Sequence, residues 1–463
     1  MLPFFLLPAF FFFLILFPSV VPAREYVAGK IAVSGNFRTR DFTVKRVMTF
    51  ESGDVLDSAS LESTIKINHD NIYNLGIFND VEIKDSMAGD SIHFRIAVSE
   101  RWYIFPISYV AFEERNFNEW WADKDLDRLV AGLGVNWKNV TGRAEDFYLY
   151  GQLGYSRRFS VNYDRPFLFP AAKIDGEFFY RFTSRKEIGY GTANGVLQLA
   201  RLTGERIQTS QVISASLKKR LSPRINITVG FNWQYFLPHD SVRILNDRYL
   251  TTSSGAETYP SFFIQYVNDQ RDIQTYPLKG YRISIFARQS GSPWIGTASF
   301  LKASIFLAHH IPLGGKWFNF AWGMQDFILL GTRVPFFDKN ILGFENFVRG
   351  YERYVIDGSL VHVSKTEFKA AIIPRRIVHM EKVPFRQFQD FPVGLYITLF
   401  ADAGIVIDNT FSNSDQYLKN RLLAGGGFGL NFITIYDALL RLEYSFNNLG
   451  ESGFFLSTRI PIR

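Results

Sequence analysis

The feature that most constrains this chain is a succession of amphipathic strands that begins near residue 102 and continues to the C-terminus. Residues 224–236 show the pattern: Ile225, Ile227, Val229, Phe231, Trp233 and Tyr235 share one face, and Asn226, Thr228, Gly230, Asn232 and Gln234 share the other. A period of two places successive side chains on opposite faces of a sheet. Residues 421–432 and 439–447 repeat it, so this part of the chain is predicted to be almost entirely β.

A soluble β-sandwich would also alternate in this way, because it buries one face of each sheet. Two observations favour a transmembrane antiparallel β-barrel. Strands of about ten residues recur over roughly 360 residues without an intervening helix, and aromatic residues gather near strand ends, as Phe167, Phe169, Phe336 and Phe337 do. About 15 to 17 strands can be counted, and 16 is the prediction because an even number is usual; residues 187–202 are the hardest to assign.

Composition agrees with a barrel. The chain is 17% aromatic and 21% charged with a mean hydropathy of −0.02, too polar for a bundle of membrane helices and unusually aromatic for a cytosolic enzyme. It has no Cys, which excludes disulfides, Cys-ligated metals and a thiol nucleophile. The net charge is +7, but Lys and Arg are spread along the chain. Lipid headgroups or a polar lumen are therefore expected partners, and nucleic acid is not.

Residues 1–23 carry no charge, have a Phe-rich stretch at 10–17 and end in Val21-Pro22-Ala23. This is the pattern of a secretory signal peptide, which is removed from the mature protein. The usual Lys or Arg near its start is missing, so a retained anchor helix is the alternative. After Arg24 no apolar stretch reaches about 18 residues, and the mature chain is predicted to have no helical membrane span.

Residues 24–100 are predicted to form a separate small α/β domain, and residues 101–463 the barrel. About 75 residues are enough for one small hydrophobic core. The order of elements in this domain is β-α-α-β-β, with strand patterns or helical spacing in residues 26–33, 40–50, 58–75, 81–83 and 93–98.

The sharpest local signal is Val348-Arg349-Gly350-Tyr351, in a long connection from about residue 331 to 357. A connection of that length without secondary structure of its own is usually functional or disordered. By itself the motif is weak, and an exposed turn is the plain alternative.

Two later strands strengthen the motif. The alternation places Glu367 and Asp402 on the lumen face of their strands. A loop folded inward would place Arg349 between these carboxylates, where the guanidinium matches them bidentately. Farther along, Gly425, Gly427 and Gly429 share one lumen-facing row, which we expect to leave room for the inserted loop.

These motifs together resemble a known family. Val33-Ser34-Gly35-Asn36 and Leu75-Gly76-Ile77-Phe78-Asn79-Asp80-Val81 resemble a POTRA domain, whose signature falls on Gly35, Asn36, Gly76, Phe78 and Val81. The Val348-Arg349-Gly350-Tyr351 loop, the strand Phe400-Ala401-Asp402-Ala403-Gly404 and the Gly-rich strand near the end resemble the barrel of the BamA/TamA-like outer-membrane assembly superfamily, also called bacterial surface antigens.

The resemblance implies that Arg349 locks the sixth extracellular loop inside the barrel, with Glu367 and Asp402 on the twelfth and thirteenth strands as partners. It implies a seam between the first strand, residues 102–112, and the last, residues 454–462. It also implies a bacterial outer-membrane protein whose N-terminal domain lies in the periplasm. The implied partners are unfolded outer-membrane protein clients and lipids, with periplasmic lipoproteins or other assembly subunits as further candidates.

The expected function is to assist insertion of other outer-membrane proteins, by strand addition to the POTRA sheet and then at the seam. One POTRA domain, where assembly factors usually have several and two-partner exporters have two, leaves two alternatives: export of a client through the lumen, or a passive pore. No G-x-S-x-G, P-loop or H-E-x-x-H motif occurs, and the adjacent His309 and His310 point to opposite faces. We therefore expect no enzyme activity, metal or cofactor.

A basic cluster is predicted in the connection between the twelfth and thirteenth strands: Arg375, Arg376, Lys382 and Arg386. A solvated turn is the plain interpretation. The alternative is contact with anionic headgroups.

Overall fold

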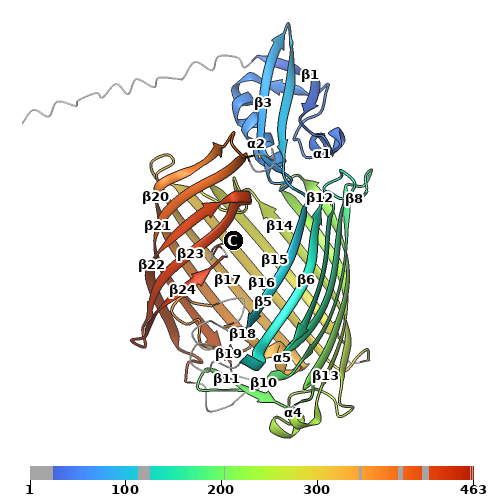
Figure 1. Cartoon of the computed structure of the whole chain (residues 1–463), viewed down its shortest axis with the longest axis vertical. Helices are drawn as coiled ribbons and strands as arrows, with labels where there is room; N and C mark the ends of the chain where they lie inside the picture. The colour runs from blue at the N-terminus through green and yellow to red at the C-terminus, as the bar shows by residue number, and fades with distance from the viewer. Residues whose placement is uncertain are drawn as a thin grey trace, which may run out of the picture.

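The computed structural model describes residues 24–112, 126–202, 204–292, 294–343, 347–383, 389–408, 417–458, 460 and 462. The leader predicted for residues 1–23 lies outside these residues. A small N-terminal domain, blue in Figure 1, sits at one end of a large barrel. We call the end of the barrel beside this domain the near end and the opposite one the far end.

The N-terminal domain contains β1 (Glu25–Ser34), α1 (Asp41–Lys45), β2 (Val55–Asp57), η1 (Ser58–Ser60), α2 (Leu61–Tyr73), β3 (Phe78–Ala88) and β4 (Ser91–Glu100). Its sheet has the order β2-β1-β4-β3, in which β1 and β4 run parallel. α1 is shorter than the predicted helix at 40–50. The prediction missed β2, because three residues are too few to show an alternation. No helix among the described residues has the length and apolar character needed to cross a membrane.

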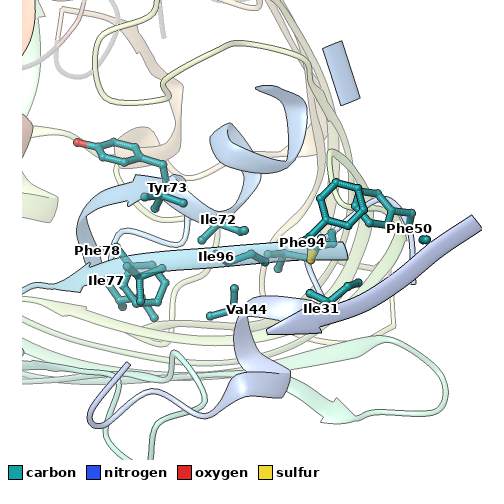
Figure 2. Packing of buried hydrophobic residues seen from close by; sticks show 14 of the residues in the cluster. Ile31, Val44, Phe50, Ile72, Tyr73, Ile77, Phe78, Phe94 and Ile96 are labelled. Carbon is teal, nitrogen blue, oxygen red and sulfur yellow. The ribbon is translucent and has the colours of Figure 1, made fainter. Parts of the chain in front are cut away.

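One hydrophobic core holds this domain together (Figure 2). Val44 of α1 and Ile72 of α2 are fully buried against Ile92 and Ile96 of β4. Both helices therefore pack on the same face of the sheet, as a two-layer domain of this size requires.

The barrel is one antiparallel sheet of 16 strands in sequence order, which confirms the predicted class and strand count. Its polar face points inward and its apolar face outward; in β13, for example, Thr228 is buried while Val229 and Trp233 are 48% and 42% exposed. A soluble sandwich would have the reverse arrangement. The strands are β5 (Ile104–Phe112), β6 (Leu129–Lys138), β7 (Asp146–Gly154), β8 (Ser156–Phe169), β9 (Ile174–Arg185), β12 (Gln208–Ser222), β13 (Ile225–Pro238), β14 (Glu257–Asp269), β15 (Gly280–Gly291), β16 (Ser299–Pro312), β17 (Phe318–Arg333), β20 (Leu360–His379), β21 (Asp390–Ile407), β22 (Leu422–Thr434), β23 (Ala438–Asn447) and β24 (Ser452–Ser457).

The segment that was hardest to assign lies outside the barrel wall. Residues 187–202 form a separate hairpin, β10 (Glu187–Ala193) and β11 (Val196–Arg201), at the far end. Phe336 and Phe337 pack in the same apolar cluster, and Phe337 stacks on Phe236 with ring centroids 4.1 Å apart. The prediction that these two rings belong to a lipid-facing belt was therefore wrong: they support the far-end loops.

The sheet ends at a seam. β5 and β24 are its two terminal strands, and the described residues contain no pairing between them. β24 has only six residues, fewer than the predicted 454–462. Ile462 instead turns into the lumen, where it is 2% exposed and packs on Ala308 and Ala321. Within the described residues, the sheet is thus open along one line, between the first and last strands, where the seam was predicted.

Candidate functional site

The long connection between β17 and β20, residues 334–359, folds into the barrel from the far end, and we call it the far-end loop. It is less irregular than predicted, because it contains α5 (Phe336–Lys339) and a two-stranded ribbon of β18 (Asn340–Leu342) and β19 (Ile356–Asp357). Val348 and Tyr351 are almost fully buried. They pack in an apolar cluster with barrel-wall residues that include Val361, Val363, Val406 and Leu423.

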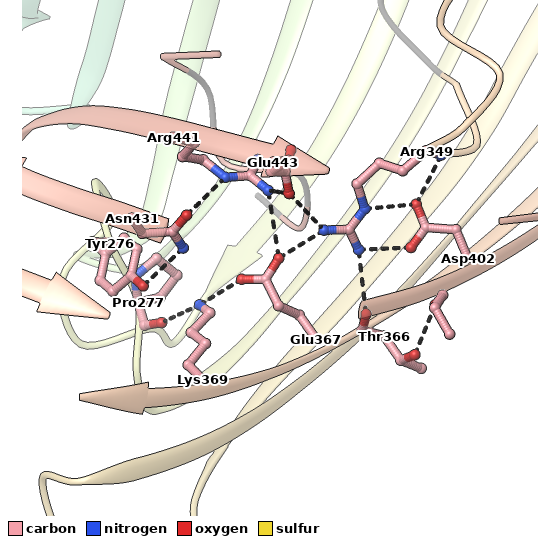
Figure 3. A network of polar contacts seen from close by, with 11 residues as sticks. Tyr276, Pro277, Arg349, Thr366, Glu367, Lys369, Asp402, Asn431, Arg441 and Glu443 are labelled. Carbon is pink, nitrogen blue, oxygen red and sulfur yellow. Dashed lines mark hydrogen bonds and ion pairs between the residues drawn. The ribbon is translucent and has the colours of Figure 1, made fainter. Parts of the chain in front are cut away.

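Arg349 lies at the centre of a buried polar network (Figure 3). Its Nε and Nη2 donate to the two carboxylate oxygens of Asp402 at 2.9 and 2.6 Å, and its backbone N–H also donates to Asp402 at 3.1 Å. Its Nη1 donates to Glu367 at 2.9 Å. The guanidinium lies 3.8 Å from the ring centroid of Phe400. The structure therefore brings together the three residues that the sequence pattern pointed to.

The network is larger than the sequence pattern predicted. Glu443 of β23 also accepts a hydrogen bond from Arg349 Nη1, at 3.3 Å, and Arg441 Nη2 lies 3.7 Å from Glu367. Lys369 Nζ lies 3.8 Å from Glu367 on its other side. The sequence does contain a signal for Glu443, Arg441 and Lys369, because each lies on the polar face of a strand that shows the alternation. What was missing was the knowledge that the loop reaches across the adjacent strands from β20 to β23.

The loop is also held beside the seam. Tyr351 donates its hydroxyl hydrogen to Asn448, just after β23, and Tyr354 donates to Glu451 at 2.8 Å. Asn447 donates to the carbonyl of Gly350 at 2.7 Å. Gly350 has a φ of +96°, a backbone conformation that a residue with a Cβ adopts only with strain. The loop therefore contacts both the wall and the last hairpin.

The row of lumen-facing glycines fits the loop only in part. A Cβ on Gly425 would lie 1.8 Å from the carbonyl oxygen of Arg349, so this glycine does make room for the loop. A Cβ on Gly427 or Gly429 would instead lie 2.1 or 2.8 Å from backbone oxygens of the adjacent strand β23. The expectation that all three serve the loop was wrong, because the tight approach of β23 restricts the other two.

The signature residues of the N-terminal domain have structural roles within that domain, in its turns and in its core. Gly35 has a φ of +84°, and a Cβ there would lie 2.0 Å from the carbonyl oxygen of Val98. Asn36 donates to the backbone of Thr39 and to Asp41, at 2.9 and 2.8 Å. Gly76 also has a positive φ, +70°, two residues before the start of β3. Phe78 and Val81 lie in the core.

Comparison with known families matches residues 139–455 to the Omp85 superfamily domain. The chain belongs to the Omp85 superfamily. Residues 26–101 match the POTRA family, described as a surface antigen variable number repeat, so the predicted resemblance is confirmed for both parts. This Omp85 protein is an outer-membrane β-barrel protein with one POTRA domain. No characterised protein matched it in a direct sequence comparison.

Two solved structures share the fold of this Omp85 protein. BamA from Haemophilus ducreyi lacking POTRA domains 1–3 has 13% sequence identity and a TM-score of 0.51, covering 94% of this chain and 83% of BamA. CdiB from Acinetobacter baumannii has 12% identity and a TM-score of 0.50, covering 94% of this chain and 74% of CdiB. At this identity the similarity establishes the fold alone.

The POTRA domain of this Omp85 protein is fixed to the near end by a buried polar cluster. Tyr73 donates to Asp437 at 2.7 Å, and Arg101 and Arg375 donate to the same carboxylate at 3.2 and 2.8 Å. Burial raises the pKa of the Tyr73 hydroxyl to about 12, so it remains a donor at neutral pH. Asp437 lies in η4 (Ile435–Asp437), the turn between β22 and β23.

The predicted role of the basic cluster was wrong for Arg375. β20 continues to His379, which places Arg375 within a strand, and its side chain turns toward the POTRA domain instead of a turn or a headgroup. Arg376 and Lys382 are exposed, and Arg386 lies outside the described residues. Among the residues that the structure describes, no cluster of His, Asp or Glu has the arrangement of a metal site.

Proposed function

We propose that this protein assists the insertion of other β-barrel proteins into the outer membrane. The observation that carries the proposal is the seam: within the described residues, β5 and β24 end the sheet without pairing to each other. Backbone N–H and C=O groups in lipid need partners within protein. An unpaired terminal strand is therefore suited to pair with a strand of a client. β5, with nine residues against six in β24, offers the longer edge.

The POTRA domain offers a first docking edge. β3 is a terminal strand of its sheet and has eleven residues, whereas β2 at the other edge has three. The half of β3 farthest from the barrel, from Lys84 to Ala88, is exposed. An exposed edge normally invites aggregation, so a long one suits a protein that binds unfolded clients. We propose that clients add to β3 in the periplasm before they reach the seam.

The position of the loop around Arg349 favours insertion of clients at the seam as the function, rather than passage of clients through the lumen. While Arg349 is held by Asp402 and Glu367, the loop occupies the lumen, and a client could pass only after the loop is withdrawn. We further propose that the protein is not an enzyme and that client folding supplies the free energy.

Export of a client is the second candidate function, and one observation favours it. A polar cavity of about 370 Å³ lies between the POTRA domain and the barrel wall. Its lining includes Asn71, Asn74, Lys218, Arg220 and Arg224. A polypeptide that enters the lumen from the periplasm would meet this cavity first.

Site-specific photo-crosslinking separates the candidates. A crosslinking residue would replace Val110 on β5 or Leu456 on β24, which are 72% and 70% exposed, or the lumenal Gln325. Ile264, an outward residue on the far wall that is 51% exposed, is the matched control. Client adducts at Val110 and Leu456 but not at Ile264 support insertion. Adducts at Gln325 without adducts at the seam would overturn it in favour of export, and a stable open conductance without any adducts would indicate a pore.

A further inference from the structure

A second loop enters the lumen, from the near end. The connection between β14 and β15, residues 270–279, turns inward, and Tyr276 at its innermost point is 1% exposed. Its ring lies 5.0 Å from the ring of Tyr396 on the barrel wall. Figure 3 shows Tyr276 and Pro277 beside the network that holds Arg349. We call residues 270–279 the inner turn.

Two wall residues hold the innermost part of the inner turn. Lys369 Nζ donates to the carbonyl of Pro277 at 3.3 Å and lies 4.6 Å from the ring centroid of Tyr276. Asn431 donates its amide hydrogen to the hydroxyl of Tyr276 at 3.1 Å. Lys369 and Asn431 are each 1% exposed, so these contacts form in a site largely shielded from water.

The same two residues orient the partners of Arg349. Lys369 Nζ lies 3.8 Å from one carboxylate oxygen of Glu367. Asn431 accepts a hydrogen bond from Arg441 Nε at 3.2 Å, and Arg441 Nη2 lies 3.7 Å from the other oxygen of Glu367. The inner turn thus touches Lys369 directly and Arg441 through Asn431, the two cations that flank Glu367, while Arg349 contacts this carboxylate at 2.9 Å.

The outer part of the inner turn is bound to the POTRA domain. Asn74, which follows α2, donates to the carbonyl of Asp272 at 2.9 Å and accepts from the backbone N–H of Gln274 at 3.3 Å. Ile273 packs against the hydrophobic core of the POTRA domain. One short segment therefore contacts the domain proposed to receive clients and the network that retains the far-end loop.

We propose that the inner turn is a POTRA-held support that positions Lys369 and Arg441 around Glu367, so that movement of the POTRA domain loosens the grip on Arg349. Coupling of this kind requires an element with two arrangements; we propose that the far-end loop is this element, with the inserted arrangement that the structure shows and a withdrawn one. This proposal rests on the proposed function, because a client that binds the POTRA domain would be the natural cause of the movement. Lys369 is a positioning residue here: it acts through Glu367.

The proposal can be tested without a client, by labelling a single introduced Cys. The chain has no Cys of its own, so only the introduced one would react. Val348 is fully buried next to Arg349, so a Val348→Cys variant in nanodiscs should react with a maleimide only when the loop withdraws. Asn74→Ala removes two hydrogen bonds to the inner turn and should raise the labelling rate about tenfold. Asn36→Ala is the matched control: it also removes two hydrogen bonds in the POTRA domain, but none to the inner turn.

A second pair of variants tests the inner contact. Lys369→Met removes the cation from Glu367 and should also raise the labelling rate, whereas Lys369→Arg keeps the charge and should restore most of the protection. Semi-native gels check that each barrel has folded. If Lys369→Met does not fold, Asn74→Ala still tests the proposal, because Asn74 lies outside the barrel. Parental labelling in Asn74→Ala, or an equal increase in Asn36→Ala, would overturn the proposal. Failure of client crosslinking at the seam would instead refute the proposed function and leave these rates unchanged.

Discussion

Replacing Arg349 by Ala tests whether the buried network retains the far-end loop. The substitution removes both hydrogen bonds from the guanidinium to the Asp402 carboxylate, at 2.9 and 2.6 Å, and leaves this aspartate 4% exposed without its guanidinium partner. Breaking a buried ion pair by removing one partner costs about 3–5 kcal/mol. Glu367 is less affected, because Lys369 and Arg441 remain beside it. Nearly all of the loss should therefore come from Asp402.

The contacts of Asp402 and Glu367 predict an order of effects among the variants. Asp402→Ala should destabilise the inserted loop about as much as Arg349→Ala. Glu367→Gln should have a smaller effect, about 1–2 kcal/mol, because it loses a charge but keeps a polar group beside Arg349. The double variant Arg349→Ala/Asp402→Ala should be less destabilised than the sum of the single variants, because residues in contact are not additive.

Heat-dependent migration on semi-native gels measures the effect, since a barrel that has lost its inserted loop should unfold at a lower temperature. Arg353→Ala is the matched control: it makes the same change four residues along the same loop, at an exposed position. If Arg349→Ala and Asp402→Ala kept the unfolding temperature of the parent, or if Arg353→Ala lowered it equally, the network would not retain the loop.

Three further predictions follow from the same contacts. Gly425→Ala should expel the loop and lower the unfolding temperature in the same gel assay, because the new Cβ would lie 1.8 Å from a loop carbonyl oxygen. Gly151→Ala, whose new Cβ would have no atom within 4 Å, should keep the unfolding temperature of the parent. Equal unfolding temperatures of the two variants would refute the steric argument. Burial raises the pKa of Glu352 in the loop from its ordinary 4.5 to about 7, so the inserted state binds an extra proton and weakens as pH rises between these values. The maleimide labelling rate of Val348→Cys, divided by that of a Cys at the exposed position 87 (Met87→Cys), should therefore rise by at most about tenfold per pH unit. Glu352→Gln should remove most of this dependence of the labelling rate on pH. Tyr73→Phe should weaken docking of the POTRA domain by about 1–3 kcal/mol, because it leaves buried charges without their shared hydroxyl; unchanged hydrogen exchange across α2 would contradict this.

The alternation of side chains made much of the site predictable. A period of two assigns each strand residue to one face, which is why the strand pattern alone places Glu367 and Asp402 in the lumen. The same rule applies to Arg441 and Glu443. They were overlooked because periodicity gives the face of a strand but not the distance across the lumen to a loop.

Other features had no signal of this kind. Residues 187–202 alternate as a wall strand would, and only the hydrogen-bond partner shows that they pair with each other and not with the barrel. The inward course of residues 270–279 depends on contacts with Lys369, about 90 residues later, and with Asn74, about 200 residues earlier. Neither contact leaves a local pattern. The end of the last strand, in contrast, did have a signal: Pro461 cannot donate a ladder hydrogen bond, and the predicted strand to residue 462 did not take this into account.

The close approach at Gly425 has a consequence for reading other sequences. Gly425 pairs directly with Asp402 on the neighbouring strand, so the residue that accepts Arg349 and the residue that leaves space for its carbonyl sit side by side in the wall. A related barrel with the loop arginine and the aspartate, but with any side chain at the position equivalent to 425, could not house the loop in this arrangement. One glycine, identified by its register and not by its place in a motif, therefore serves as a marker for whether such a barrel is plugged.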